Sequence, residues 1–329
     1  GIVFNTVQSN SITDALAASF DAEASGSGFA IIVGLIIAVA AGIIFVGGVH
    51  RISAIAAVIV PVMAVLYLIL GIIVLVLNMD AVPGMIATIF AEALGLQSIG
   101  GAALGTIMME GIRRGLFSNE AGIGSVPNAA ATASASHPAK QGLVQSLGVY
   151  FDTLLVCSIT GFIVLLSNPE YGTPQGSQLT QTALASQVGQ WGVHFLTIAI
   201  FFFAFSSILG NYYYGQTNIE YLTKSKAALN GYRLVVVAAV FFGSVVALDA
   251  VWTAANIAMA IMAFINLIAV LLLSRTVLRI LRDYQQQRKE GVEPIFHKDR
   301  MSDLDGLDAW DGTDEVTQAE FWEARGEKR

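Results

Sequence analysis

The sequence predicts an all-α protein that crosses a membrane several times. Two observations support this prediction. Of the 329 residues, 55% are hydrophobic and only 12% are charged, whereas a soluble domain carries roughly 25% charged residues. The mean hydropathy is +0.68, and the apolar residues lie in long runs. A helix needs about 20 mostly apolar residues to cross a bilayer, and several runs reach that length.

The predicted spanning helices follow one another with short polar breaks. The first ends in a tight basic turn, the second has a proline in its first half, and the third is rich in small residues. Residues 1–28 form a polar lead-in to which we assign no helix. In order, the predicted helices are 29–49, 52–78, 101–135, 142–167, 188–222, 232–250 and 253–273.

Two segments between these helices are less apolar. Residues 79–100 contain Asp80, Pro83 and Glu92, which favours a connecting segment with a short amphipathic helix. Residues 168–187 contain several prolines and glycines and are typical of an aqueous loop. We therefore expect a transmembrane domain over residues 1–283.

The remaining residues, 284–329, are predicted to form a cytoplasmic C-terminal tail. This tail is acidic and polar. Its aspartates at 305, 308, 311 and 314 look like a solvated face, and we assign them no calcium site.

Lysine and arginine in short loops predict the orientation, because they favour the cytoplasmic side. The basic loops are residues 50–51, 137–140, 224–233 and 275–282. An even number of predicted helices separates each loop from the next, so all four can face the cytoplasm. The connections at 79–100 and 168–187 then face outside, and the C-terminus is cytoplasmic.

The composition excludes several kinds of protein. A single cysteine, Cys157, cannot form a disulfide framework, and four histidines without a Cys/His cluster argue against a structural zinc site. A membrane-embedded enzyme needs a catalytic pair, and no predicted helix pairs Asp152 with a second acid. We therefore expect no enzyme, no catalytic residue, no organic cofactor and no nucleic-acid partner.

The stretch Gly-Leu-Phe-Ser-Asn-Glu-Ala-Gly, residues 115–122, interrupts a predicted spanning segment. A polar break is tolerated at membrane depth only where it is buried in protein or lines a cavity. Secondary transporters bind substrate and cation at such breaks. Ser118 and Asn119 are therefore candidate ligands, and Glu120 is a candidate cation or gating group. The alternatives are close helix packing and a structural ion pair of Arg114 with Glu120 or Glu110.

Three further polar groups lie in or beside apolar segments. Gln8 and Asn10 belong to a compact polar run that an ordinary loop would also explain. Asp152 lies deep in a predicted helix, where a carboxylate needs a partner or a cation. Ser206 and Ser207, with Asn211 one turn later, suit either a sodium site or hydrogen bonds back to the helix carbonyls.

These motifs together resemble the alanine or glycine:cation symporter family of bacteria and archaea. The likeness rests on the runs GLFSNEAGIGS, VQSNS, LGVYFDTLLVCSITG and FSSILGNYYYG, and extends from residue 1 to about Asp283. It implies a LeuT-type fold of two inverted repeats with broken first helices. It also implies sodium-coupled uptake of alanine, glycine or a similar small neutral amino acid across the inner membrane of a prokaryote. Some members use protons instead.

The resemblance also implies roles for single residues. Phe117, Ser118 and Asn119 match positions that line the substrate pocket, and Gln8 and Asn10 match a polar pair that enters it. Ser206 and Ser207 match the hydroxyl pair of a sodium site.

Two departures from the family pattern follow from the same comparison. The family commonly has tryptophan where this chain has Asn211, so a wider pocket is expected. Family members begin well before Gly1, so we expect a C-terminal portion that lacks the first broken helix and does not transport by itself.

The rival function of a different class is an ion channel. A channel needs a continuous polar lining or rings of charge, whereas the polar residues here gather at one depth. Besides the amino acid and the cation, membrane lipid is the expected partner, and the sequence leaves the oligomeric state open.

Overall fold

The computed structural model describes residues 1–23, 26–94, 101–169, 176–303 and 307–325. All regular elements in these ranges are helices. The chain divides into two compact units, one of Gly1–Glu120 with Asp152–Ile261 and one of Ala121–Phe151 with Met262–Arg329. Within the described part, six helices are long and apolar enough to cross a membrane: Gly28–Val46, Arg51–Leu77, Pro138–Leu166, Gln190–Leu222, Lys226–Val245 and Asp249–Lys289.

The chain is therefore all-helical and of multi-pass type, as predicted. The predicted span 101–135 is not among the six, because its helix, Gly101–Asn119, carries three charged residues, Glu110, Arg113 and Arg114. The first unit consists of α1 (Ile2–Phe20), α2 (Gly28–Val46), α3 (Gly48–Leu77), α4 (Val82–Ala93), α5 (Gly101–Asn119), α8 (Ser158–Leu166), α9 (Gln178–Val188), α10 (Gln190–Leu222), α11 (Lys226–Val245) and the start of α12 (Leu248–Lys289).

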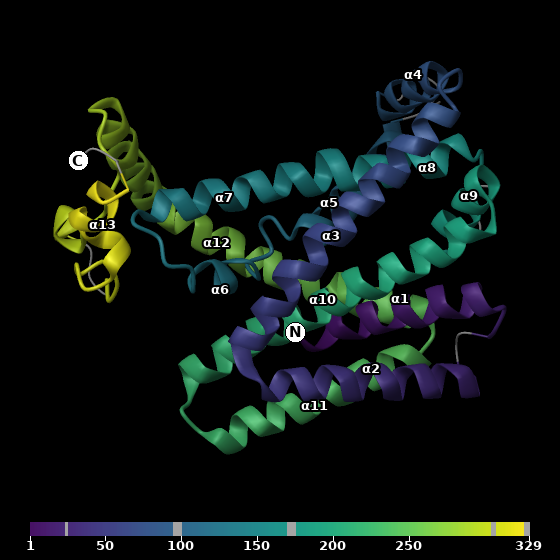
Figure 1. The fold of residues 1–329 in the computed structure, drawn as a ribbon, viewed down its shortest axis with the longest axis horizontal. Coiled ribbons are helices and arrows are strands. Elements are labelled where there is room, and N and C mark those ends of the chain that lie inside the picture. Colours follow the sequence, from purple (N-terminus) through teal and green to yellow (C-terminus); the bar gives the residue numbers. More distant parts are fainter. Residues whose placement is uncertain (24–25, 95–100, 170–175, 304–306, 326–329) are drawn as a thin grey trace. The chain divides into compact units, whose positions relative to one another are not determined.

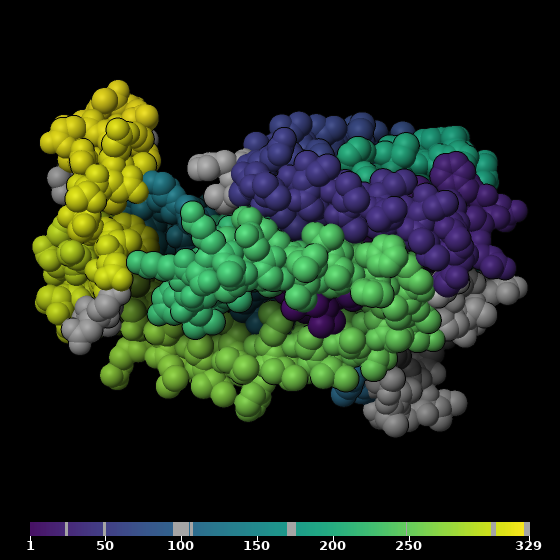
Figure 2. All heavy atoms as spheres, turned by 90° about the horizontal axis from the view of Figure 1, so that it is seen from below, coloured from purple at the N-terminus to yellow at the C-terminus, as the bar shows by residue number. Residues whose placement is uncertain are grey.

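α1 lies where no helix was predicted. Its polar residues Asn5, Ser9, Asn10 and Thr13 are buried. The Asn10 amide donates to the carbonyls of Gly243 and Val246 in and just after α11, at 2.9 and 2.8 Å. In Figure 2 only a small dark-purple patch of the first residues is visible beside the green helix α11. Hydropathy missed α1 because its polar residues are buried in the unit: Asn10 bonds to α11, and the Ser9 and Thr13 hydroxyls donate to carbonyls of α1 itself.

α2 and α3 show the opposite pattern, with large apolar side chains exposed along their outer faces. Such faces suit the hydrocarbon core of a bilayer, where an apolar side chain costs nothing to expose. The exposed side chains include Ile31, Ile32, Leu35, Ile36 and Ile43 of α2 and Val62, Val65, Ile69, Ile72 and Val76 of α3.

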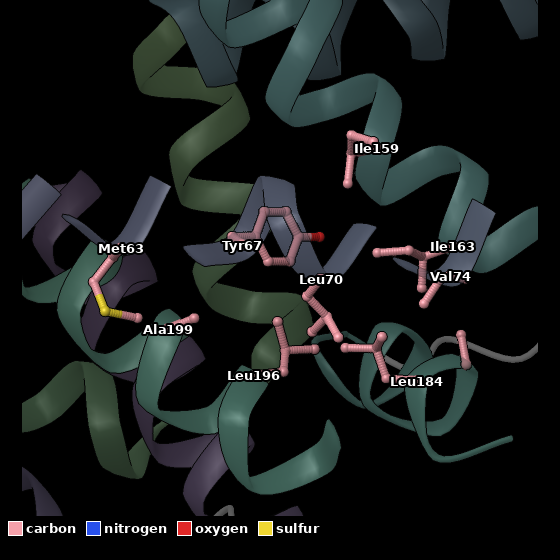
Figure 3. Packing of buried hydrophobic residues seen from close by; sticks show 10 residues of the cluster. Met63, Tyr67, Leu70, Val74, Ile159, Ile163, Leu184, Leu196 and Ala199 are labelled. Carbon is pink, nitrogen blue, oxygen red and sulfur yellow. The ribbon is translucent and has the colours of Figure 1, made fainter. Parts of the chain in front are cut away.

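A core of apolar side chains joins α3, α8, α9 and α10 (Figure 3). Tyr67 of α3 lies in this core with Leu70 and Leu196, and its hydroxyl lies 2.7 Å from the Thr160 hydroxyl of α8. Ile159 and Ile163 of α8 face the same core. This packing fixes α8 and therefore the polar segment that precedes it.

The turns and short helices at the two ends of the first unit lie at the predicted connections. Figure 1 shows the α2–α3 and α10–α11 turns at one end of this unit and α4 and α9 at the other. α4 is the short helix expected within residues 79–100, of which 95–100 lie outside the described residues. Two boundaries were wrong. α9 occupies part of the predicted loop 168–187, and α11 already begins at Lys226 within the predicted loop 224–233.

The second unit contains α6 (Pro127–Ala130), α7 (Pro138–Tyr150), the end of α12, and the tail with α13 (Ala319–Glu323). α12 extends to Lys289, past the predicted domain boundary at Asp283. The tail beyond it is not merely solvated, because Ile295, Phe296 and Met301 are buried. Of the four predicted solvated aspartates, Asp314 accepts a hydrogen bond from Ser134 at 2.8 Å, and Asp305 lies outside the described residues.

Candidate functional site

The predicted helix break is present, but it begins later than expected. α5 continues through Gly115 to Asn119, and the chain then leaves the helix at Glu120 with φ 54°. Gly122 and Gly124 also have positive φ, 80° and 91°, which favours glycine. A Cβ on Gly124 would lie 2.8 Å from the Asn266 side chain. The break therefore covers the residues between Asn119 and Pro127.

The end of α5 is bonded to a π-helical segment, Phe151–Cys157. The Ser118 hydroxyl donates to Oδ2 of Asp152 at 2.7 Å, and the Asn119 amide donates to the Thr153 hydroxyl at 3.0 Å. Single π-helical turns frequently mark functional sites. The structure thus brings Ser118, Asn119 and Asp152 together, three residues that the sequence analysis selected from two separate motifs.

Asp152 receives a second donor on the same oxygen, because the Cys157 thiol lies 3.8 Å from Oδ2 and 3.1 Å from the Ser118 hydroxyl. Thr153 and Cys157 are site residues that the sequence analysis did not select. A period of five residues would have been the signal for Cys157, since a π-helix aligns residues i and i+5.

An aromatic group borders the same end of α5. The Phe117 ring packs edge-on against Phe4 of α1, with centroids 5.6 Å apart, and 4.8 Å from Trp252 of α12. The Arg114 guanidinium lies 4.5 Å over the Trp252 ring. It also lies 3.9 Å from the Glu110 carboxylate, to which the neighbouring arginine donates. The alternative ion pair of Arg114 with Glu110 is therefore present.

The polar residues of α1 are not all turned to this cluster. Phe4 contacts it, whereas Asn10 is bonded to α11 and Gln8 is half-buried. Asn5, which the sequence analysis passed over, is fully buried, and neither polar atom of its amide has a hydrogen-bond partner among the described residues. A buried amide in this condition is costly, so Asn5 is an additional candidate for contact with a ligand or a water molecule.

Ser206 and Ser207 lie in the middle of α10. Both hydroxyls donate to the carbonyl of Phe203, at 2.8 and 3.1 Å. This is the back-bonded arrangement given above as the alternative to a sodium site, although each hydroxyl oxygen keeps lone pairs for a cation. Asn211 is buried one turn later. Within the described residues, no cluster of three His, Cys, Asp or Glu side chains is arranged to hold a metal ion.

The chain is similar in sequence to known transport proteins. The model of the sodium:alanine symporter family matches residues 1–298. The amino-acid carrier protein AlsT of Bacillus subtilis is 46% identical over 94% of this chain, and the probable sodium/glutamine symporter GlnT of the same organism is 46% identical over 96%. The sodium/alanine symporter AgcS of Methanococcus maripaludis is 36% identical over 88%. The chain spans 65%, 65% and 63% of the lengths of these relatives.

Proposed function

The chain belongs to the sodium:alanine symporter family, and we propose that the complete protein carries a small neutral amino acid into the cell together with Na⁺. The proposal rests on the cluster at the helix break, where Ser118 and Asn119 meet Asp152 and Thr153. Hydroxyl, amide and carboxylate groups of this kind match the ammonium and carboxylate of an amino acid. Phe117, which precedes Ser118 in α5 and packs on Phe4 and Trp252, would contact the small apolar side chain.

The cation is expected at oxygen atoms. Ser206 and Ser207 supply two hydroxyl oxygens in one turn of α10, and Asp152 and Glu120 supply negative charge at the break. Sodium coupling provides the driving force, since one positive charge moving down 100 mV releases roughly 2.3 kcal/mol. Proton coupling is the alternative, and a relative from Bacillus strain PS3, 34% identical, bears the name sodium/proton-dependent alanine carrier protein.

The proposed architecture is the LeuT type, with two inverted repeats and a substrate site between them at the midplane. α5 and the break after Asn119 correspond to the broken first helix of the second repeat. The membrane is the cytoplasmic membrane, and the tail lies on the cytoplasmic side. Alternating access around the site follows from this architecture: substrate and Na⁺ together favour closure on the outside before the inside opens.

Counterflow in proteoliposomes tests this function. Vesicles containing the complete protein and unlabelled alanine should accumulate labelled alanine transiently and saturably, and only with Na⁺ present. A channel would give a flux that does not saturate with alanine. Uptake that follows a proton gradient and ignores Na⁺ would replace sodium by proton coupling.

Two observations support glutamine as a second substrate. GlnT bears glutamine in its name, and the buried amide of Asn211 stands where the resemblance leads us to expect tryptophan. Asn211→Trp should therefore reduce competition by glutamine for labelled alanine uptake more than competition by serine. If glutamine competes equally well in the unsubstituted protein and in the Asn211→Trp variant, Asn211 does not line the side-chain pocket.

A further inference from the structure

The tail of the second unit folds back onto the segment that precedes α7. After α12 the chain turns at Gly291, which has φ 75°. The backbone N–H of Phe296 then donates to the Ser136 carbonyl at 2.8 Å. The Ser136 hydroxyl donates in return to the Pro294 carbonyl at 3.0 Å. Farther along, the Trp310 indole N–H donates to the Ala135 carbonyl at 2.9 Å. Three hydrogen-bonding groups of this short segment are thus occupied by the tail.

A buried aromatic group fills the contact. Phe296 is 1% exposed and lies edge-on to the His137 ring at 5.5 Å and to Trp310 at 5.9 Å. The Tyr284 ring of α12 lies 5.3 Å from His137. Edge-to-face ring pairs attract one another beyond the area that they bury, so the tail is docked by packing as well as by hydrogen bonds.

His137 is completely buried, and its tautomer follows from its partners. Nδ1 accepts the backbone N–H of Ala139 at 3.1 Å, as the N-cap of α7. The proton is therefore on Nε2, which donates to Oδ2 of Asp283 at 3.1 Å. Arg300 of the tail pairs with the same carboxylate, and Gln287 donates to it at 2.8 Å. α7, α12 and the tail meet at this one carboxylate.

Charged residues at the edge complete the contact. Lys140 of α7 pairs with Glu293 and lies 4.4 Å over the Trp322 ring, while Ser134 donates to Asp314 at 2.8 Å. The family match ends at residue 298. The tail residues after it, Asp314 and Trp322 among them, therefore lie outside the part of the chain that matches the family.

We propose that residues 293–303 and 307–322 form a latch that fixes the start of α7 to the end of α12 and slows the transport cycle while it is closed. α7 runs directly into the π-helical segment that carries Asp152 and Thr153. A latch on the first turn of α7 therefore restrains the helix that supplies half of the candidate site. The contact is rich in polar and charged groups, which is typical of interfaces within a chain that separate during function.

The inference rests on the proposed function for its readout of transport. Ser134→Cys with Asp314→Cys places a thiol on each side of the latch, and Cys157 is retained because it contacts Asp152 and Ser118. Oxidation of the complete protein in proteoliposomes should cross-link the pair and lower the maximal rate of sodium-dependent alanine uptake, with no change in substrate affinity. Reduction of the same sample should restore the rate, and each single-substitution variant serves as a matched control.

Opening the latch should have the reverse effect. Trp310→Ala removes the bond to Ala135 and the packing on Phe296, and the loss of one hydrogen bond shifts a two-state equilibrium about five-fold. The maximal uptake rate should therefore rise by up to about five-fold. Trp191→Ala, which alters an exposed tryptophan of α10, is the control. Failure to cross-link, or equal uptake in the oxidised and reduced samples, overturns the latch. Absence of uptake in the unsubstituted protein overturns the proposed function instead, and cross-linking in those vesicles still reports whether the tail docks.

Discussion

The helix break after Asn119 and the tail contact at His137 are both polar interruptions next to apolar helices, but their polar groups are used differently. At the break, Asp152 accepts Ser118 and Cys157 on the same oxygen, Oδ2, and the neighbouring side chains come from helix ends. At the tail contact, Asp283 is shared by a histidine, a glutamine and an arginine on both of its oxygens. The first arrangement suits a ligand, whereas in the second both carboxylate oxygens are occupied by side chains of the protein, as the closed form of the latch requires.

This difference predicts which measurements each region controls. Substitutions at the break should change transport and leave stability nearly unchanged. Substitutions at the tail contact should change docking of the tail and its response to pH, and leave substrate affinity unchanged.

Asp152→Asn should have the largest effect. The amide still accepts the Ser118 hydroxyl, but the negative charge is lost. Hydrogen bonds to charged groups are worth about 1.5–3 kcal/mol, so uptake should fall on the order of 100-fold while the melting temperature stays nearly constant. Asp314→Asn makes the same chemical change in the tail and should not reduce uptake. If uptake falls equally in Asp152→Asn and Asp314→Asn, the helix break and the tail contact do not differ in their role in transport.

Asn119→Ala should raise the KM for the amino acid about 10-fold, because one hydrogen bond to a charged ligand group is lost. The measurement is initial-rate uptake at saturating Na⁺, with insertion checked by surface labelling. Asn218→Ala is the control, since the Asn218 amide donates to a carbonyl of its own helix, at Tyr214. An unchanged KM would show that Asn119 only anchors α5 to Thr153.

Ser206→Ala combined with Ser207→Ala should shift the sodium dependence of uptake to higher concentration. The shift should be several-fold, because two oxygen ligands of the cation are removed at a cost of about 0.5 kcal/mol each. Affinity for the amino acid at saturating Na⁺ should change less. If the sodium dependence of uptake is unchanged and only the maximal rate falls, the two serines stabilise α10 through their hydrogen bonds to the Phe203 carbonyl and do not bind the cation.

The smallest expected effect is that of low pH on docking of the tail. Burial lowers the pKa of His137 below its usual value, and Lys140 and Arg300 act in the same direction, whereas the hydrogen bond to Asp283 opposes it. The folded protein thus binds fewer protons at this site than the unfolded chain. The stabilisation from neutral His137 is complete above about pH 6.5 and is lost as the pH falls from there through the lower folded pKa.

Docking of the tail should therefore weaken as the pH falls below about 6.5, by at most about 1.4 kcal/mol per pH unit. The yield of the disulfide cross-link between positions 134 and 314, formed with a pH-independent oxidant, measures this dependence. His137→Gln should flatten the curve, because its amide can accept the Ala139 N–H without titrating. An identical slope in the variant would assign the dependence to another group at the contact. These groups are Asp283, Tyr284, Lys140, Arg300 and Glu293.

The helical class, most of the spanning helices and the helix break were all evident from the sequence. Long apolar runs such as α2 are unambiguous because lipid accepts apolar side chains on every exposed face. The glycines and polar residues of the stretch 115–122 do not suit a lipid-facing helix, so a break was also predictable, although it begins only after Asn119. Ser118, Asn119 and Asp152 were candidates from the sequence because polar groups at membrane depth are often functional.

Three other features depend on tertiary packing: residues 2–20 are a buried helix, Ser118 meets Asp152, and the tail docks on His137. In each case a polar group pairs with a partner far away in the sequence, as the Asn10 amide does with the Gly243 carbonyl. Local patterns report whether a segment prefers water or lipid. They do not report whether another helix supplies the missing hydrogen bonds, and that pairing decides what a polar segment becomes inside a membrane protein.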